Sequence, residues 1–389
     1  MSIITSLRLQ DWRNFTEFES SLNEGINYLV GDNGVGKTSV VEAIYYLAHR
    51  KSWRTNHPRE LIRRGQLGSY LTFTIEDKKY VLKLTRGESI QLSVDGKIQT
   101  NAAILNKLLP VLLFTFDDLQ IIQGAPQFRR ELLDTTISLV DQEYRKLLVD
   151  YKKVLRTRTG VLHALKKGVV SSPNLIDSNA LVDNASSNTL DSTVEPFTNR
   201  HSPATNNSAV LTDITYQLMV IGTKIMLKRL EFFPQIEPLV NRYYNYFLGE
   251  ASQVNLLYQP SFMLKGLSAA EIYDQFDKSI KYEQNVEIHS GHNLFGPHRD
   301  DFGILFNHES TKHFFSLGEQ WSMALSFKLV QAELIKHQKP LLIFDDVFAI
   351  IDQKRSLKLV EILQESPQVF ITTHQLSKDL SDNQKVIQL

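Results

Sequence analysis

The 389-residue sequence contains no cysteine, so disulfides and thiolate metal sites are excluded and a reducing compartment fits. It carries no net charge, because 43 basic residues balance 43 acidic ones, and global charge therefore indicates no partner. It also lacks an apolar run near the length of about 18 residues that a membrane span needs. Arg8, Asp11 and Arg13 stand where a signal peptide would be apolar. We expect a soluble cytoplasmic protein.

The length exceeds the usual limit for one hydrophobic core, which predicts two domains or one domain with a large insertion. Both ends of the chain show strand and helix patterns in alternation, and short strand patterns between residues 71 and 94 predict an antiparallel sheet with a turn at Asp95-Gly96. Strands are predicted at 3–9, 26–30, 71–75, 80–84, 90–94, 302–306, 341–344 and 369–372, and helices at 37–49, 319–336 and 356–365.

The middle of the chain has the pattern of long helices, beginning at Pro126. Apolar residues step by three and four from Ile137 to Val154 and from Leu211 to Ile225, which predicts two helices packed along a heptad seam. Residues 171–208 are rich in Ser, Asn and Thr without hydrophobic periodicity, and we expect a loop or disordered insert there. The predicted architecture is α/β, with a head built from residues 1–124 and 286–389 and an inserted helical arm of residues 125–285.

Residues 31–38 read GDNGVGKT between a predicted strand and a predicted helix, which is the pattern and the context of a phosphate-binding P-loop. The glycines let successive backbone N–H groups and the helix N-terminus converge on phosphate oxygens. Lys37 is expected to reach the β and γ phosphates of ATP, and the Thr38 hydroxyl to bind Mg²⁺. The predicted nucleotide-binding residues here are Gly31, Asp32, Asn33, Gly34, Val35, Gly36, Lys37, Thr38 and Ser39.

A second motif is the apolar run PLLIF, which ends in Asp345 and Asp346. In a Walker B arrangement the first carboxylate joins the Mg²⁺ shell, and the second orients or deprotonates the attacking water. Two aspartates after a strand also suit a helix cap. The P-loop elsewhere in the chain favours the Walker B interpretation.

A third motif, the SxGxQ pattern of Ser316, Gly318 and Gln320, opens the helix before that strand. A serine there also suits simple helix capping. Asp352 follows Asp345 by seven residues, and His374 follows the next strand. The order of P-loop, signature, Walker B, D-loop and switch histidine matches the ABC-type ATPase head, in which the signature helix of one subunit meets the γ-phosphate bound by another. The predicted catalytic residues are Lys37, Ser316, Asp345, Asp346 and His374; Ser316, Gly318, Gln320 and Asp352 are also predicted to bind nucleotide.

Longer motifs resemble the RecF family, bacterial DNA replication and repair ATPases of the SMC-like branch with a P-loop sheet, an antiparallel subdomain and a helical arm. They are LRLQDWRNF at 7–15, WRT at 53–55, ELIRRG at 60–65, GAPQFRRELLD at 124–134 and GPHRDDF at 296–302. The resemblance implies an ATP-dependent homodimer, Mg²⁺ and slow DNA-stimulated ATP hydrolysis. It also implies binding at single-strand/double-strand DNA junctions near the nucleoid, and cooperation with RecO and RecR in loading recombinase at gaps.

The sequence departs from the family pattern at elements that bridge subunits. Trp321 follows Gln320 where a glutamine-like residue is usual, residues 349–352 (AIID) are less polar than usual, and Phe116 stands in place of a proline. Nucleotide binding is therefore a firmer expectation than efficient hydrolysis. Two alternatives stay open: a non-hydrolysing nucleotide-bound DNA scaffold, and an ABC-type ATPase of another DNA-processing or defence system.

A basic segment supports a DNA partner apart from the resemblance, because residues 145–167 hold eight basic residues and one acid. A helix stripe of one sign suits contacts with the DNA backbone, and the alternative is the solvated face of a coiled coil. The DNA-binding candidates are Lys152, Lys153, Arg156 and Arg158.

A second basic cluster surrounds Trp53, and within it Arg54 is a candidate for contact with the ATP phosphates in cis. A DNA-binding or purely structural role for Arg54 stays open. His298 and Arg299 have no predicted role.

Overall fold

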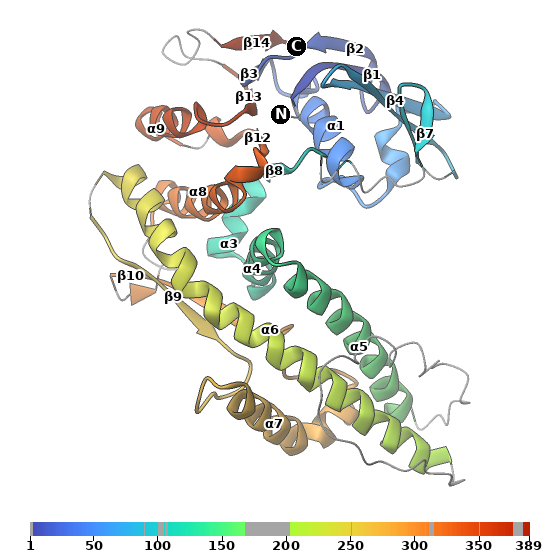
Figure 1. Cartoon of the computed structure of the whole chain (residues 1–389), viewed down its shortest axis with the longest axis vertical. Coiled ribbons are helices and arrows are strands. Elements are labelled where there is room, and N and C mark those ends of the chain that lie inside the picture. Colours follow the sequence, from blue (N-terminus) through green and yellow to red (C-terminus); the bar gives the residue numbers. More distant parts are fainter. Residues whose placement is uncertain are drawn as a thin grey trace. The chain divides into compact units, whose positions relative to one another are not determined.

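The computed structural model divides the chain into two compact units, each described here by itself (Figure 1). The head unit comprises Met1–Leu132, Pro234–Leu257 and Gly303–Leu389, and the arm unit comprises Leu133–Phe233 and Tyr258–Phe302. The structure describes residues 3–88, 90–99, 105, 108–167, 203–249, 251–307, 309–310, 315–349, 351–375 and 384–389.

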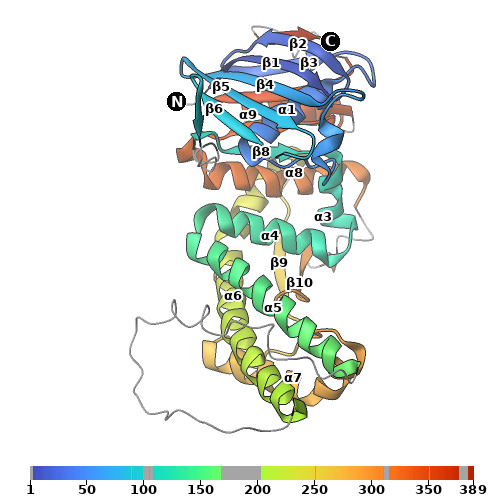
Figure 2. The same ribbon diagram turned by 90° about the vertical axis from the view of Figure 1, so that its right-hand side faces the viewer.

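One sheet of the head unit is antiparallel, as the alternating patterns predict, and Figure 2 shows it face on. Two of its hairpin turns, Glu76-Asp77 and Asp95-Gly96, carry positive φ at both central residues, which matches the right-handed twist of the strands. The strands run in the order β2-β1-β4-β5-β6-β7 and are β1 (Ile4–Trp12), β2 (Phe15–Ser21), β4 (Gly68–Ile75), β5 (Lys78–Thr85), β6 (Gln91–Val94) and β7 (Lys97–Gln99).

The other main sheet is parallel in every pairing that the structure describes, in the order β14-β3-β13-β12-β8. Its inner strands are buried on both faces, which is why they read as continuous apolar runs. Two edge strands, β8 and β14, were not predicted; they are only partly buried, so they lack the continuous burial of the inner strands. The strands are β3 (Gly25–Val30), β8 (Val111–Phe114), β12 (Leu341–Phe344), β13 (Gln368–Thr373) and β14 (Lys385–Gln388).

Two hydrophobic cores cover the two faces of this parallel sheet. Along β12, Ile343 packs in a core shared with α1 (Lys37–His49) and the antiparallel sheet, while Phe344 packs in the other core with α8 (Leu317–Leu334) and α9 (Gln353–Leu363). The chain ends therefore meet in one core, as predicted. Short helices complete the head unit: η1 (Pro58–Leu61), η2 (Phe116–Leu119), α3 (Gln120–Gln123), η5 (Lys336–Gln338) and η6 (Val347–Ala349).

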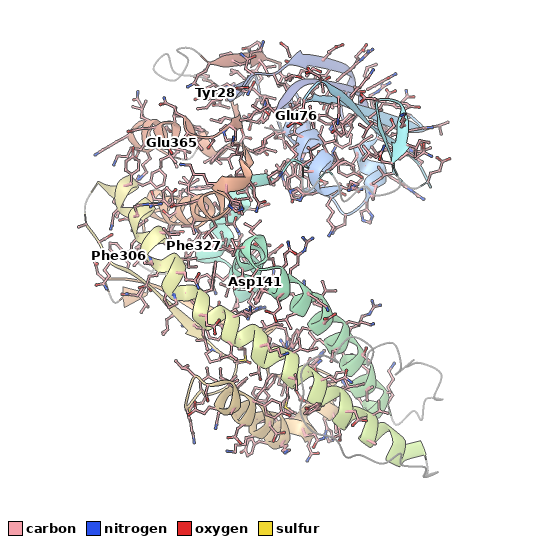
Figure 3. The ribbon with its side chains drawn as sticks, in the orientation of Figure 1. Tyr28, Glu76, Asp141, Phe306, Phe327 and Glu365 are labelled. Carbon is pink, nitrogen blue, oxygen red and sulfur yellow. The ribbon has the colours of Figure 1, made fainter. Side chains whose placement is uncertain are left out.

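The predicted continuous helix from Pro126 is wrong, because it breaks at Asp141 between α4 (Pro126–Val140) and α5 (Gln142–Lys166) (Figure 3). Asp141 has extended backbone angles, and its carboxylate accepts a hydrogen bond from the Tyr144 amide as an N-cap. Val140, a predicted seam residue, is consequently 47% exposed. The rest of the seam includes buried Tyr144, Tyr151 and Val154 on α5.

The arm unit contains α5, most of α6 (Pro203–Leu248) and α7 (Ala269–Ser290), which begins at a Ser268/Glu271 capping box. Of the predicted insert, residues 171–202 lie outside the described residues, and 203–208 are helical instead. The predicted boundary at 285/286 falls inside α7, and residues 234–257 group with the head unit, so the compact units have other bounds than the sequence-based domains. Strands β9 (Val254–Gln259), β10 (Asp301–Phe306) and β11 (Glu309–Ser310) form a third sheet.

Helix α6 is apolar enough between Ala209 and Leu248 to cross a membrane by length and composition. Its apolar side chains have another use, because Met219 and Met226 pack with Ile272 and Phe276 of α7 in the arm core. Burial in a protein core therefore accounts for the composition of this helix.

Candidate nucleotide site

The P-loop connects β3 to α1 and needs glycine for two separate reasons. Gly34 and Gly36 have φ of 86° and 120°, which is left-handed backbone. A Cβ on Gly36 would also lie 2.4 Å from the Phe15 ring and 2.9 Å from the Asn14 side chain. Gly36 serves as the N-cap of α1 without a side-chain cap, so the first N–H groups of the helix are left for an anion.

Lys37 is held across the loop, not extended into solvent. Its side-chain ammonium donates to the carbonyl oxygens of Gly31, at 2.7 Å, and Asp32, at 3.0 Å, and the residue is only 4% exposed. An ammonium group has three donors, so one remains for a phosphate oxygen. The geometry therefore fits the role predicted for this lysine.

The Walker B carboxylate follows β12 and joins a hydroxyl from α1 with a hydroxyl from β13. Asp345 Oδ1 accepts hydrogen bonds from Thr38 Oγ1, at 3.0 Å, and from Thr372 Oγ1, at 2.8 Å. Burial raises the pKa of Asp345, and these two hydrogen bonds oppose that shift. Thr372, which the sequence did not single out, also accepts a 2.8 Å hydrogen bond from the Asp346 amide.

A hydroxyl beside one carboxylate fits Mg²⁺, which takes oxygen ligands and usually completes its shell with phosphate and water. No cluster of three His, Asp or Glu residues that could hold a metal alone occurs in the part of the chain that the structure describes. Thr38 and Asp345 are the residues that would hold the ion, and they would need the nucleotide to complete its coordination.

Asp346 takes a strained conformation, with φ of 54°, and lines the pocket in front of the P-loop. His374 lies beside the start of the loop, with Nδ1 3.3 Å from the Gly31 carbonyl oxygen and 3.6 Å from the Asp32 carboxylate. The structure therefore brings both predicted residues to the P-loop.

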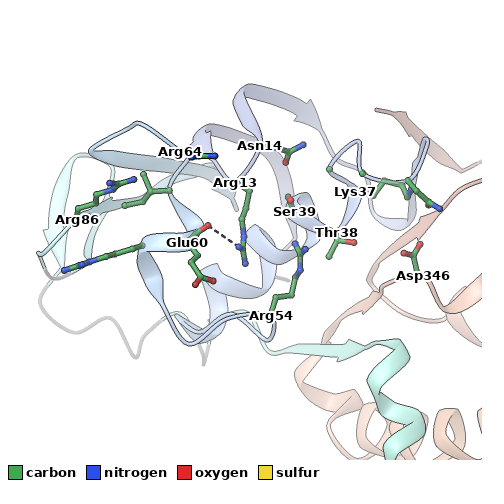
Figure 4. Close-up of a pocket in the computed structure, with 15 residues that line it drawn as sticks. Arg13, Asn14, Lys37, Thr38, Ser39, Arg54, Glu60, Arg64, Arg86 and Asp346 are labelled. Carbon is green, nitrogen blue, oxygen red and sulfur yellow. Dashed lines mark hydrogen bonds between the residues drawn. The ribbon is translucent and has the colours of Figure 1, made fainter.

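The pocket has a volume of about 790 Å³ and a strongly cationic wall (Figure 4). Arg13 and Arg54 both pair with Glu42, which is fully buried on α1, at 2.5 Å and 3.5 Å. Arg54 thus reaches the pocket as predicted, whereas Arg13 and Glu42 were missed. The lining residues are Arg13, Asn14, Asn33, Gly34, Gly36, Lys37, Thr38, Ser39, Arg54, Arg59, Glu60, Ile62, Arg64, Arg86 and Asp346.

The signature residues lie at the start of α8 and do not line this pocket. Ser316 is an exposed N-cap whose hydroxyl donates to Glu319 in a capping box. The side-chain oxygen Oε1 of Gln320 accepts a hydrogen bond from the side-chain amide of Gln123. Asp352 caps α9 and binds Arg355. The predicted signature and D-loop thus form a second polar edge of the head unit.

The basic face of α5 is smaller than predicted. Lys152, Lys153 and Arg156 are exposed, but Arg158 is 1% exposed and donates to Glu287 at 2.6 Å. The prediction that Arg158 binds DNA is therefore wrong. Arg158 lies seven residues after Tyr151, so it shares the buried face of the helix, and this spacing was the overlooked signal.

The GPHRDDF motif lies in the arm unit, where Asp300 and Phe302 are buried and Arg299 is exposed. The Tyr151 hydroxyl and His298 Nδ1 are 2.8 Å apart, and Arg299 Nε donates to the Asn293 carbonyl at 2.9 Å. Asp300 is buried, and burial raises its pKa although the Arg229 charge opposes the shift. These contacts account for the motif by packing and hydrogen bonding within the arm.

Residues 3–388 match the family described as RecF/RecN/SMC N terminal domain. The DNA replication and repair proteins RecF of Bacillus thuringiensis (strain Al Hakam) and Bacillus cereus (strain AH187) are each 29% identical over 381 residues, covering 95% of this chain and 91% of theirs. A solved structure of the recombination mediator protein RecF with ATPrS has a TM-score of 0.77 at 20% identity, covering 100% of this chain and 96% of its own.

The head domain of Smc from Pyrococcus furiosus, solved with an extended coiled coil, superposes with a TM-score of 0.53 at 16% identity, covering 100% of this chain and 93% of its own. Together with the observed sheets, these likenesses confirm the predicted ABC-type ATPase head fold.

Proposed function

The chain belongs to the RecF/RecN/SMC N-terminal domain family, and we propose that it is an ATP-binding, ATP-hydrolysing protein of DNA replication and repair. The resemblance to RecF indicated by its motifs is confirmed over 95% of the chain. The observation that carries the proposal is the Thr38–Asp345–Thr372 cluster beside Lys37, because it unites the P-loop with the Walker B strand. We place its action in the cytoplasm, near the nucleoid.

Each residue of the cluster has a distinct task. The loop amides and Lys37 bind the triphosphate, and Thr38 with Asp345 holds Mg²⁺. Bound Mg·ATP supplies the phosphoanhydride bond and the cation that neutralises charge at the γ-phosphate. Asp346 accepts a proton from, or orients, the attacking water, and His374 positions the loop through the Gly31 carbonyl.

The active unit is a homodimer formed on ATP. Support comes from the place of Ser316, Gly318 and Asp352, which lie away from the P-loop pocket of their own chain on an exposed edge. The N-terminus of α8 favours an anion there, and the P-loop of a second copy would provide the γ-phosphate. ATP then holds the dimer together, and hydrolysis releases it.

DNA binds the dimer largely without sequence preference, at single-strand/double-strand junctions, with RecO and RecR as further partners in recombinase loading at gaps. Exposed Lys152, Lys153 and Arg156 on α5 support a contact with the phosphate backbone. The name shared by the Bacillus relatives supports the role in replication and repair.

The departures from the family pattern do not favour a non-hydrolysing scaffold. Trp321 and Ile351 are 1% and 7% exposed, and both pack in the core with α9. Their apolar character thus serves the interior of the head unit, and Ser316 and Asp352 remain as exposed polar residues that a partner would meet.

Steady-state ATPase, measured with and without gapped DNA, tests the proposal. We expect slow turnover that DNA increases and that Lys37→Ala lowers by about 100-fold or more, because the positioned charge on the phosphates is lost. Sedimentation of the hydrolysis-impaired Asp346→Asn variant with ATP should show a dimer. Turnover that survives Lys37→Ala would remove the enzymatic claim, and an Asp346→Asn monomer in ATP would remove the dimer.

A further inference from the structure

Arg355, the third residue of α9, lies against the start of the signature helix. Its guanidinium Nη1 is 2.7 Å from the point where a Cβ on Gly318 would stand. Gly318 does not have positive φ, so its backbone conformation does not require glycine. A Cβ there would meet the end of the Arg355 side chain, whose positive charge therefore lies beside the first turn of α8.

A cation at a helix N-terminus is unfavourable in isolation, because the free N–H groups already give that end partial positive charge. Two carboxylates offset it in the single chain. Asp352 binds Arg355 Nη1 at 2.7 Å, and Glu319 accepts hydrogen bonds from the backbone N–H and the hydroxyl of Ser316. Within one subunit, the Asp352 and Glu319 carboxylates thus offset the positive charge at the N-terminus of α8. A bound anion would offset this charge better.

The guanidinium keeps capacity for a ligand. Its side chain is 20% exposed, and the ion pair that it makes within the described residues uses Nη1. Ser316 beside it is exposed, and Leu317 is 51% exposed. An anion approaching the first turn of α8 from outside therefore meets a helix N-terminus, a hydroxyl and an arginine together.

We propose that Arg355 acts in trans: it supplies positive charge to the terminal phosphate of the ATP held by Lys37 of a second copy of this chain. The inference rests on the proposed ATP-driven dimer. In the dimer, Asp352 keeps the guanidinium beside Gly318, and Arg355 stabilises the negative charge that spreads over the phosphate oxygens in the transition state. Arg355 thereby couples the D-loop helix to the signature helix and to the neighbouring nucleotide.

The alternative is a purely structural arginine that joins α8 to α9 within one subunit. Both interpretations predict that Arg355→Ala loses ATPase activity, and both leave ATP binding by the P-loop of the single chain intact. Loss of activity alone therefore does not separate them, and the position of the charge relative to the nucleotide has to be measured.

Mixing two inactive variants makes that measurement. A heterodimer of Arg355→Ala and Lys37→Ala subunits has one site that combines an intact P-loop with an intact Arg355 from the other subunit. If Arg355 acts in trans, an equimolar mixture recovers about one quarter of wild-type activity, because half of the dimers are mixed and each has one complete site. If Arg355 serves the nucleotide of its own subunit, no site in any dimer is complete and the mixture stays inactive. An arginine that only holds α8 against α9 also allows recovery, because the signature helix that it supports meets the P-loop of the other subunit. That structural role predicts a lower Tm for nucleotide-free Arg355→Ala, whereas the trans role leaves this Tm unchanged.

Two control mixtures bracket the result. Ser316→Ala with Lys37→Ala should recover activity, because a signature residue and a P-loop residue from different subunits make one site. Asp345→Ala with Lys37→Ala should not, because both residues serve the same P-loop. Fluorescent ATP analogue binding by the Arg355→Ala protein, expected within about twofold of wild type, confirms that the variant is folded, and Arg355→Lys should retain part of the activity by keeping the charge.

The outcomes separate the two proposals. Recovery in the Ser316 control but not in the Arg355 mixture overturns the trans role and leaves the dimer standing. Absence of ATP-driven dimers in the wild-type protein overturns the dimer and the inference together. An Arg355→Ala protein with wild-type activity overturns the inference alone.

Discussion

Arg54 in the head unit and Arg158 in the arm unit both pair with a fully buried glutamate, yet their surroundings differ. The Arg158 side chain is 1% exposed, and its three nitrogens donate to Thr215, Asn293 and Glu287. The Arg54 side chain is 43% exposed, and its contact with Glu42 is longer, at 3.5 Å. Each nitrogen of the Arg158 guanidinium has a hydrogen-bond partner within its own unit. The Arg54 guanidinium is held at one end and faces a pocket.

This difference separates structural charges from charges available to a ligand. A buried ion pair with all donors satisfied fixes the packing of the helices around it, and removing one partner leaves an uncompensated charge. A half-exposed arginine anchored on a buried acid has a defined position and free donors, which is what binding a phosphate requires. Type of residue and local charge density are the same in both cases, so only three-dimensional burial distinguishes them.

The largest expected effect is on stability. Arg158→Gln should lower the free energy of unfolding by about 3–5 kcal/mol, because Glu287 is left buried without its partner. Arg54→Gln should cost less than about 1 kcal/mol, since its pair is partly solvated. Urea denaturation followed by circular dichroism gives both values. Equal losses in the two variants would contradict the comparison.

Exposed arm charges should affect DNA binding and leave stability unchanged. Reversing Lys152, Lys153 and Arg156 to glutamate should weaken binding at least tenfold or so, and should reduce the slope of log affinity against log salt by about three. Fluorescence anisotropy with gapped DNA at several salt concentrations measures both quantities.

The matched control for that triple variant is Lys278→Glu with Lys281→Glu, on α7 of the same unit. Both lysines are exposed but already paired with Asp274 and Asp277. We expect a much smaller change in affinity and slope. A control as damaging as the triple variant would show a general charge effect, and would remove α5 from the DNA path.

The sequence predicts the parts of the fold that rest on local pattern. Strands β3, β12 and β13 stand out because burial on both faces makes them continuous apolar runs. The break at Asp141 was missed because the three-four spacing of apolar residues continues across it, and the capping contact with Tyr144 is visible only in the structure.

In the nucleotide site, too, some residues could be predicted from local sequence pattern and others could not. Spacing alone locates Lys37 and Asp345, because the P-loop and the Walker B strand each have a local signature. Thr372 and Glu42 were missed, since their roles depend on strands and loops that meet only after folding. Arg158 was assigned wrongly because a count of charges along α5 ignores which face each residue occupies.

The smallest expected effect concerns Asp345 of the nucleotide site, a half-buried acid whose charge is meant for a ligand. Burial raises the pKa of Asp345 above its ordinary value of 3.8. The folded state therefore binds this proton more tightly than the unfolded state does. Its contribution to stability is fully present below the ordinary aspartate pKa and is lost as pH rises through the raised pKa of the folded state.

Asp345→Asn replaces the titrating carboxyl group by an amide, so this loss of stability at rising pH does not occur. Without nucleotide, we expect the Tm of Asp345→Asn to exceed the wild-type Tm slightly at pH 7, and this advantage to shrink toward pH 4, whereas Mg·ATP should raise the Tm of the wild type only. Asp77→Asn, at an exposed turn position with φ of 62°, is the control for replacing an aspartate by asparagine. An Asp345→Asn protein less stable than wild type at pH 7 would mean that Thr38 and Thr372 stabilise the carboxylate more than burial penalises it. Asp345 would then resemble Arg158, a charge that its own unit already satisfies.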